Sequence, residues 1–378
     1  MALSRLPALF MRGGTSKGLV FDVRDLPADQ DKRDRIFLSA MGSPDPNGRQ
    51  LDGMGGGLSS LSKVCIVGPS SRDDADIDYT FAQISVGDMQ VDYAGNCGNM
   101  ASAVGPAALE LGIVEARGGE ARLRVHNTNT ARIIEARFPV EDGLLASNGD
   151  LAIDGVAGTG APIRLDFLDP GGSKTGRLLP TGNPVDDLRL PDCSTIKASL
   201  VDSANPCVYV SAADLGKSGN EHPEDLAADA AFQSRMEHIR LAASVRMGLT
   251  PDLAAAAQMP SIPKVAVVAP PGEVTLLDGS RLGKTDMDIL VRMISMGQPH
   301  RAIPMTGAIC LAAACRIEGA IPALAVQSEG QALRLGHPSG TTMVDADVAG
   351  TGEGTEIASA TLFRTARLLF SGTVHFRD

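Results

Sequence analysis

The amino-acid sequence predicts an α+β protein made of two domains with similar folds. Its 378 residues are enough for two hydrophobic cores of ordinary size. The 42 Gly and 23 Pro favour many short strands joined by tight turns over a helical bundle. Two patterns in the first half of the chain recur in the same order in the second half, which indicates a duplicated fold.

Each segment of the first half has a local reason for its predicted structure. Residues 6–22 contain two apolar strands joined by a polar, Gly-rich loop, and residues 29–41 change from charged to apolar with a helical period. The apolar run at 61–67 predicts a buried strand, and turn residues predict hairpins at 79–93 and 122–139. Small residues after Cys97 predict a buried helix that either kinks or restarts at Pro106.

The second half repeats part of this order. The segment 199–210 resembles the first strand, loop and strand, and residues 305–314 resemble the small-residue helix. Residues 223–247 have the clearest helical pattern, with Pro223 suited to the first turn. Turn chemistry between 169 and 184 predicts the linker, so we expect domains at 1–183 and 184–378. Whether the last strand returns to the first domain is left open.

Composition and charge exclude several classes of function. A net charge of −11 and 3% aromatic residues without Trp argue against nucleic-acid binding, and no signal peptide or membrane span is evident. Six cysteines without a CxxC pair favour a reducing, cytoplasmic compartment, and six scattered histidines argue against a metal site. The Gly-rich stretch 53–57 lacks a dinucleotide fingerprint, and no phosphate-binding loop occurs, so neither a dinucleotide nor a nucleoside triphosphate is expected.

The strongest local chemical signal is the segment Asn96–Asn99, between a strand and a helix start. Unpaired backbone N–H groups at a helix N-terminus stabilise anions, so we expect a thiolate to be favoured at Cys97 and a substrate carboxylate to be bound beside it. The alternative is that Cys97 is a small apolar core residue.

Two further polar segments are candidates. Lys63 opens a buried strand and is either a solvated cation at a strand end or a reactive amine. The loop 12–18 combines two cations with two hydroxyl groups, which suits carboxylate binding, although an ordinary surface loop would look the same. The loop 336–340 is similar, and His337 within it is a catalytic or a structural histidine.

Seven segments taken together resemble the PrpF-type isomerase family, whose members isomerise methylitaconate, aconitate or 4-oxalomesaconate. They run along the whole chain: Met11–Gly18, Gly42–Asp45, Gln50–Gly53, Ser60–Lys63, Asp78–Tyr79, Asn96–Asn99 and Gly336–Gly340. The resemblance implies a diaminopimelate epimerase-like fold, in which each domain is a curved, mostly antiparallel sheet wrapped around a central helix. It also implies an active site in the interdomain cleft.

The same resemblance assigns roles to individual residues. It pairs Lys63 with Cys97 as the catalytic acid and base, and it places Thr306 where a two-thiol epimerase would carry a second cysteine. The substrate-binding residues that it implies are Thr15, Ser16, Lys17, Gly98, Asn99, Met100, Asn205, Thr306, Gly307 and Ser339.

The expected activity is a 1,3-allylic shift, or tautomerisation, in a small unsaturated di- or tricarboxylate, without a cofactor or metal. The expected partner is this small anionic substrate, with neither nucleic acid nor membrane, and a homodimer is left open. Two alternatives remain: an accessory protein of an aconitase-like methylcitrate dehydratase, and an amino-acid epimerase or racemase, which Thr306 disfavours.

Overall fold

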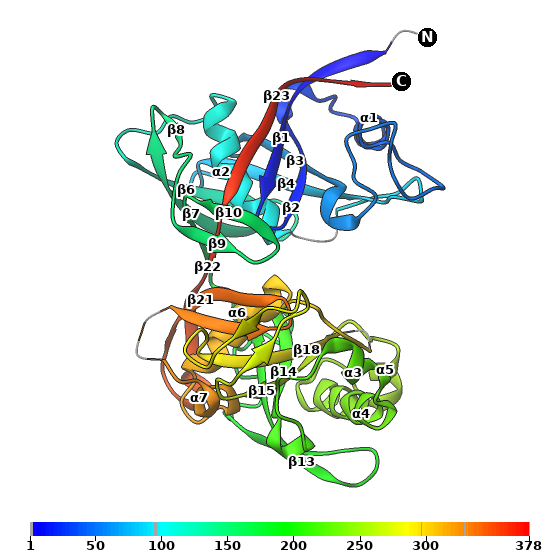
Figure 1. The fold of residues 1–378 in the computed structure, drawn as a ribbon, viewed down its shortest axis with the longest axis vertical. Helices are drawn as coiled ribbons and strands as arrows, with labels where there is room; N and C mark the ends of the chain where they lie inside the picture. The colour runs from blue at the N-terminus through cyan, green and yellow to red at the C-terminus, as the bar shows by residue number, and fades with distance from the viewer. Residues whose placement is uncertain (1–2, 94–96, 296, 329, 331, 378) are drawn as a thin grey trace. The chain divides into compact units, whose positions relative to one another are not determined.

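The protein was analysed as a computed structural model, which describes residues 3–93, 97–295, 297–328, 330 and 332–377 (Figure 1). The chain forms two units, one of residues 1–167 with 363–378 and one of residues 168–362. The division after residue 167 lies before the predicted boundary at 183, and the last strand belongs to the first unit. None of the described helices combines the length and the apolar character needed to cross a membrane.

The first unit is built mainly of strands, with two α-helices in its described part. Its elements are β1 (Ser4–Gly13), β2 (Ser16–Asp22), α1 (Gln30–Met41), β3 (Lys63–Pro69), β4 (Ile77–Ile84), β5 (Val91–Asp92), α2 (Gly98–Glu110), β6 (Glu120–Asn127), β7 (Arg132–Glu141), β8 (Leu144–Leu145), β9 (Leu151–Ile153), β10 (Val156–Gly160), β11 (Ile163–Leu168) and β23 (Ala366–Phe376).

The second unit has a similar composition, with additional short helices. Its elements are β12 (Asp186–Arg189), β13 (Thr195–Ser203), β14 (Asn205–Ser211), α3 (Pro223–Ala228), α4 (Ala230–Arg246), α5 (Leu253–Ala257), β15 (Lys264–Ala269), β16 (Val274–Thr275), β17 (Arg281–Leu282), β18 (Ile289–Ser295), β19 (Gln298–Pro299), α6 (Met305–Arg316), α7 (Ile321–Ala325), β20 (Leu333–His337), β21 (Gly340–Ala349) and β22 (Glu356–Arg364), in which the chain returns to the first unit.

The two units repeat one order of strand pairing. In the first, β1–β2 is antiparallel, β2–β3 parallel, β3–β4 antiparallel, β4–β6 parallel and β6–β7 antiparallel. In the second, β13–β14, β14–β15, β15–β18, β18–β20 and β20–β21 follow the same alternation. The helices α2 and α6 occupy equivalent places, each before the fifth strand of its series. This shared topology is the physical basis of the two sequence echoes.

Small residues let the sheet close around α2. Gly98 and every residue from Met100 to Leu109 are buried, and a methyl group on Gly105 would collide with the ring of Phe138 on β7. The helix packs against β1, β2 and β3 (Figure 1). It continues through Pro106, so the predicted restart at that residue is wrong.

The sheet of the first unit carries a helix on each face. Phe10, Leu19, Val64 and Ile66 point to one face, where they form a hydrophobic core with Phe37 and Met41 of α1. The alternate residues of the same strands point to the other face, toward α2. Because successive side chains alternate, the direction of any side chain on these strands follows from its register.

The second unit differs from the sequence prediction in one helix. The pattern over 223–247 predicts a single helix, but α3 ends at Ala228 and α4 begins at Ala230. Asp229 separates them, because its carboxylate accepts the backbone N–H of Phe232 at 2.9 Å and caps α4. Its side chain also forms an ion pair with Lys217 at 2.8 Å. A strong N-cap residue therefore outweighs the continuous helical period.

Candidate active site

Lys63 is the first residue of β3 and points to the α2 face of the sheet. Its neighbours Val64 and Ile66 belong to the core around α1, so Lys63 and Cys65 point the other way. The Nζ atom of Lys63 donates a hydrogen bond to Oε1 of Gln83, the residue directly opposite on β4, at 2.6 Å. It also lies 5.0 Å from the centre of the Phe81 ring. With 7% of its surface exposed, Lys63 is not the solvated strand-end cation of the alternative interpretation.

Cys97 is the N-cap residue of α2 and is half-buried. Its backbone is extended, at φ −119° and ψ 99°, and its side chain makes no capping hydrogen bond. Its carbonyl oxygen accepts the N–H of Ala101 at 2.8 Å and the hydroxyl of Tyr79 at 3.4 Å. Asn96, the first residue of the predicted motif, lies outside the described residues. The thiol therefore stands where a helix leaves backbone N–H groups unused, which is the position that the sequence predicted.

A second thiol, that of Cys65, lies between the Lys63 amine and the Cys97 thiol in these electrostatic contacts. Burial raises the pKa of Cys65, and the charge of Cys97 raises it further, while a hydrogen bond from Tyr79 and the charge of Lys63 lower it. Lys63 and Cys65 share one face of the sheet with Tyr79, and the Tyr79 hydroxyl contacts the Cys97 carbonyl oxygen on that face. Burial also raises the pKa of Tyr79, with contributions from both thiols. The structure thus brings Lys63 and Cys97 together on one face of one unit.

The turn between β1 and β2 packs against both candidates because of its glycines. A methyl group on Gly18 would collide with the carbonyl oxygen of Lys63, and one on Gly13 would collide with that of Asn99. Within the turn, Thr15 accepts a hydrogen bond from Nδ2 of Asn99 at 3.0 Å, and Ser16 is buried. These two hydroxyl residues therefore lie beside the start of α2.

Lys17 is not brought to this face. It pairs with Arg12 across the hairpin, one residue out of step with Ser16 and Gly18, so its side chain points to the opposite face of the sheet. Its ammonium lies 5.5 Å from the centre of the Phe10 ring, which belongs to the core around α1. The loop composition indicated cations near the substrate, but strand alternation separates Lys17 from Lys63.

The first turn of α2 contains the other predicted residues of this unit. Gly98 is the first helical residue and is buried. Asn99 links two segments, because its Nδ2 donates to Thr15 and its Oδ1 accepts from Nε of Arg364 at 3.2 Å. Met100 is completely buried, so its side chain belongs to the packing of α2 and only its backbone could meet a ligand.

Four predicted residues belong to the second unit. Asn205 opens β14 after the left-handed residue Ala204, and its Nδ2 donates to the carbonyl oxygen of Pro206 at 3.0 Å. Thr306 and Gly307 lie in the first turn of α6. Ser339 donates to the carbonyl oxygen of Arg301 at 2.7 Å. A shared site of these residues with Lys63 stays a prediction.

His337 has structural contacts in the second unit. It is 4% exposed, and its Nε2 lies 3.0 Å from the hydroxyl of Thr342. Its Nδ1 accepts the backbone N–H of Ser339 at 3.3 Å. The structural interpretation of this histidine therefore fits its surroundings better than a catalytic one.

Sequence reasoning missed the residues that support Lys63 and Asn99. Gln83 lies on a strand predicted only as part of a hairpin, and Arg364 is 265 positions from Asn99. The register Lys63↔Gln83 could have been found by pairing the two strands from the turn between them. No local signal connects Arg364 to Asn99, because the contact depends on the return of the chain to the first unit.

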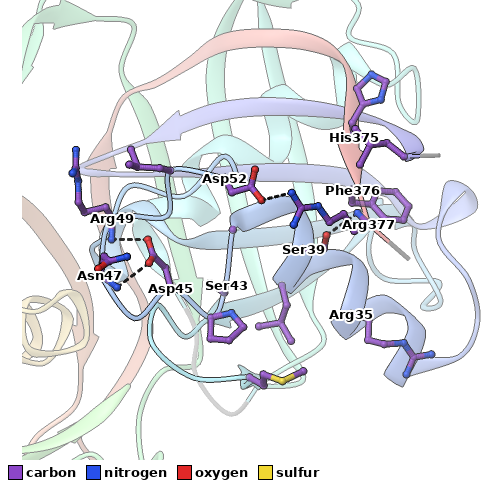
Figure 2. Close-up of a pocket in the computed structure, with 16 residues that line it drawn as sticks. Arg35, Ser39, Ser43, Asp45, Asn47, Arg49, Asp52, His375, Phe376 and Arg377 are labelled. Carbon is purple, nitrogen blue, oxygen red and sulfur yellow. Dashed lines mark hydrogen bonds and ion pairs between the residues drawn. The ribbon is translucent and has the colours of Figure 1, made fainter. Parts of the chain in front are cut away.

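A separate hollow of about 650 Å³ lies elsewhere in the first unit, beside α1 and the end of β23 (Figure 2). None of the predicted site residues lines it. Asp45 in its wall is satisfied by the backbone N–H groups of Asn47 and Arg49, at 2.8 and 3.0 Å. Asp52 is paired with Arg377 at 2.9 Å (Figure 2). The carboxylates of Asp45 and Asp52 in the wall of the hollow therefore already have partners within the protein.

Across the described residues, no group of three or more His, Cys, Asp or Glu side chains is placed to hold a metal ion. None of the six cysteines forms a disulfide. The described residues supply the site with an amine, a thiol, hydroxyl groups and helix N–H donors.

By its fold and its relatives, the protein is an isomerase. The crystal structure of a methylitaconate-delta-isomerase superposes with a TM-score of 0.91 and 39% sequence identity, over 100% of this chain and 96% of that chain. The chain belongs to the PrpF protein family, whose model matches residues 3–377.

Curated relatives agree with this assignment along the whole chain. The 3-methylitaconate isomerase of Eubacterium barkeri is 40% identical over 98% of this chain and 97% of its own length. The 4-oxalomesaconate tautomerase of Pseudomonas putida is 41% identical over 99% of this chain and 97% of its own length. The 2-methyl-aconitate isomerase of Cupriavidus necator is 37% identical over 98% of this chain and 96% of its own length. The predicted family, fold class and enzyme class are therefore confirmed.

Proposed function

We propose that this protein shifts a carbon–carbon double bond within a small unsaturated di- or tricarboxylate by proton transfer, without a cofactor. The names of three relatives support the substrate class, because methylitaconate, 2-methyl-aconitate and 4-oxalomesaconate are all compounds of this kind. The observation that carries the proposal is the placement of Lys63 and Cys97 on one face of the first unit, where Lys63 opens β3 and Cys97 caps α2 beside Tyr79 of β4.

The proposed reaction needs one base and one acid. The base removes a proton from the carbon next to the double bond, and the electron pair of that C–H bond spreads through the double bond into a conjugated carboxylate or ketone. The acid then delivers a proton to the carbon two positions away, and the double bond lies between the other pair of carbons. Lys63 and Cys97 are assigned as this pair, and the order in which they act depends on the substrate's orientation.

The N-terminus of α2 supports the charged intermediate. Unused N–H groups in its first turn face the same end of the helix as the Cys97 thiol, and such preorganised donors stabilise a developing oxyanion by roughly 3 kcal/mol each. The absence of disulfides suits a reducing compartment, so the proposal places the enzyme in the cytoplasm.

An ultraviolet assay with methylitaconate, 2-methyl-aconitate and 4-oxalomesaconate tests the proposal. We expect turnover of at least one compound by the wild-type protein, and a loss of about a thousandfold or more in Lys63→Met and in Cys97→Ser. Lys32→Met and Cys193→Ser are matched controls, because both side chains are exposed and neither is among the predicted site residues.

Turnover should also survive dialysis against a chelator. Full activity in both site variants, or no turnover of any of the three compounds, would refute the proposal. The second result would leave the accessory role as the better interpretation.

A further inference from the structure

Arg364 brings a guanidinium group to the start of α2. Its Nε donates to Oδ1 of Asn99 at 3.2 Å, and its Nη1 donates to the carbonyl oxygen of Phe363 at 2.9 Å. Within the described chain, Nη2 has no hydrogen bond. Gly14 makes room for the side chain, because a methyl group at that residue would lie 3.1 Å from Cδ of Arg364.

No carboxylate of the described residues balances the charge of this guanidinium. No carboxylate among the described residues forms an ion pair with Arg364, although burial lowers the pKa of Arg364 to about 10 and Cys97 acts in the opposite direction. A half-buried cation of this kind is costly without an anionic partner. The candidate catalytic thiol of Cys97 is close enough to influence this guanidinium electrostatically.

Two other arginines show the usual arrangement. Arg240 is 4% exposed and forms an ion pair with Glu237 at 2.6 Å. Arg292 is 2% exposed, and Glu221 raises its pKa against the effect of burial. Each has a carboxylate in its surroundings, which Arg364 lacks among the described residues.

We propose that Arg364 binds a carboxylate group of the substrate beside the carbon that exchanges its proton with Cys97. This inference rests on the proposed function and identifies the group that recognises the anionic substrate. A guanidinium presents parallel N–H donors that match the two oxygens of a carboxylate, and Asn99 holds Nε in place. Thr15 fixes the other end of the Asn99 amide, so the turn between β1 and β2 helps to orient Arg364.

The assignment predicts effects on binding and on chemistry. A carboxylate held here accepts charge from the adjacent carbanion, so the contact becomes stronger as the proton leaves. Replacing Arg364 should therefore raise KM and also lower kcat. A residue with a purely structural role would change the stability instead.

Calorimetric titration with tricarballylate, a saturated tricarboxylate that cannot isomerise, separates binding from turnover. We expect Arg364→Gln to bind it about 10 to 100 times more weakly than the wild-type protein. Arg364→Lys keeps the charge without the paired donors and should bind at least threefold more weakly. Arg367→Gln is the matched control with unchanged binding, since Arg367 is exposed and lies opposite Arg12 on β1.

The outcomes distinguish this inference from the proposed function. Lys63→Met should lose turnover and keep its affinity for tricarballylate, while Arg364→Gln loses affinity. Circular dichroism shows whether each variant is folded. If Arg364→Gln does not fold, the affinity of Arg364→Lys tests the inference instead. The inference would be overturned if the folded Arg364 variants bind tricarballylate within twofold of the wild-type affinity. It would also be overturned if neither the wild-type protein nor any variant binds tricarballylate.

Discussion

Replacing Gln83 by Leu tests how strand β4 holds the Lys63 amine. Gln83 accepts a hydrogen bond from Lys63 at 2.6 Å, and its amide donates to the carbonyl oxygens of Ser59 and Ser62 at 3.0 and 2.9 Å. A hydrogen bond to a charged group contributes about 1.5–3 kcal/mol, and Lys63 is too buried for water to replace its partner fully. Because the contacts of the amide with these two carbonyl oxygens are lost as well, we expect the free energy of unfolding to fall by about 3 kcal/mol.

This loss should lower the melting temperature of the first unit by about 6–12 °C in scanning calorimetry. We also expect kcat to fall about tenfold or more, because the amine is no longer held in position. Gln90→Leu is the control, since Gln90 is exposed at the end of the same hairpin. Melting of Gln83→Leu within 2 °C of the wild-type protein, with an unchanged kcat, would refute the reasoning.

Three further predictions concern the same unit. In a Cys193→Ala background, iodoacetamide should modify Cys97 first and abolish turnover, because the other four cysteines are buried. Gly18→Ala should destabilise the protein by several kcal/mol, roughly the cost of overpacking a core, because its methyl group would meet a backbone carbonyl of β3. Burial of Glu135 opposes its ionisation, but two arginines outweigh this effect and lower its pKa from 4.5. Below about pH 4.5 the melting temperature should therefore fall less steeply in Glu135→Gln than in the wild-type protein.

Each of these has a control or a result that would contradict it. Mass spectrometry locates the alkylated cysteine, and modification of Cys97 that spares turnover would count against its role. Gly87→Ala should be tolerated, because open space surrounds Gly87, and equal melting temperatures of the two glycine variants would contradict the packing argument. The carboxylate of Glu135 stabilises the fold above pH 4.5 and loses its effect as it is protonated, so an unchanged acid profile in Glu135→Gln would show that the ion pairs contribute nothing.

Local pattern predicted most of the secondary structure because most elements carry their own signals. The helix at 29–41 is α1, which Asp29 caps by accepting the N–H of Lys32 at 2.8 Å. The hairpins at 79–93 and 122–139 are β4–β5 and β6–β7. Pairing between distant strands could not be read in the same way: β23 pairs with β1 across almost the whole chain, and no local pattern records that partner.

The candidate site was predictable at the level of single motifs and less so in its support. Cys97 and Lys63 were found through a helix start and a strand start, both of which are sequence features. The role of Lys17 depended on which face of the hairpin it occupies, and that follows from a register set by the turn. Arg364 reaches Asn99 only because the chain returns to the first unit, so tertiary structure alone reveals it.

Solvent deuterium incorporation tests the central claim most directly, that the Lys63 amine and the Cys97 thiol together move a proton between two carbons. Wild-type turnover in deuterium oxide, followed by NMR, should place deuterium at the carbon that receives the proton. Lys63→Met and Cys97→Ser should each lack this signal above the uncatalysed background. Deuterium incorporation at the wild-type rate in both variants would contradict the account.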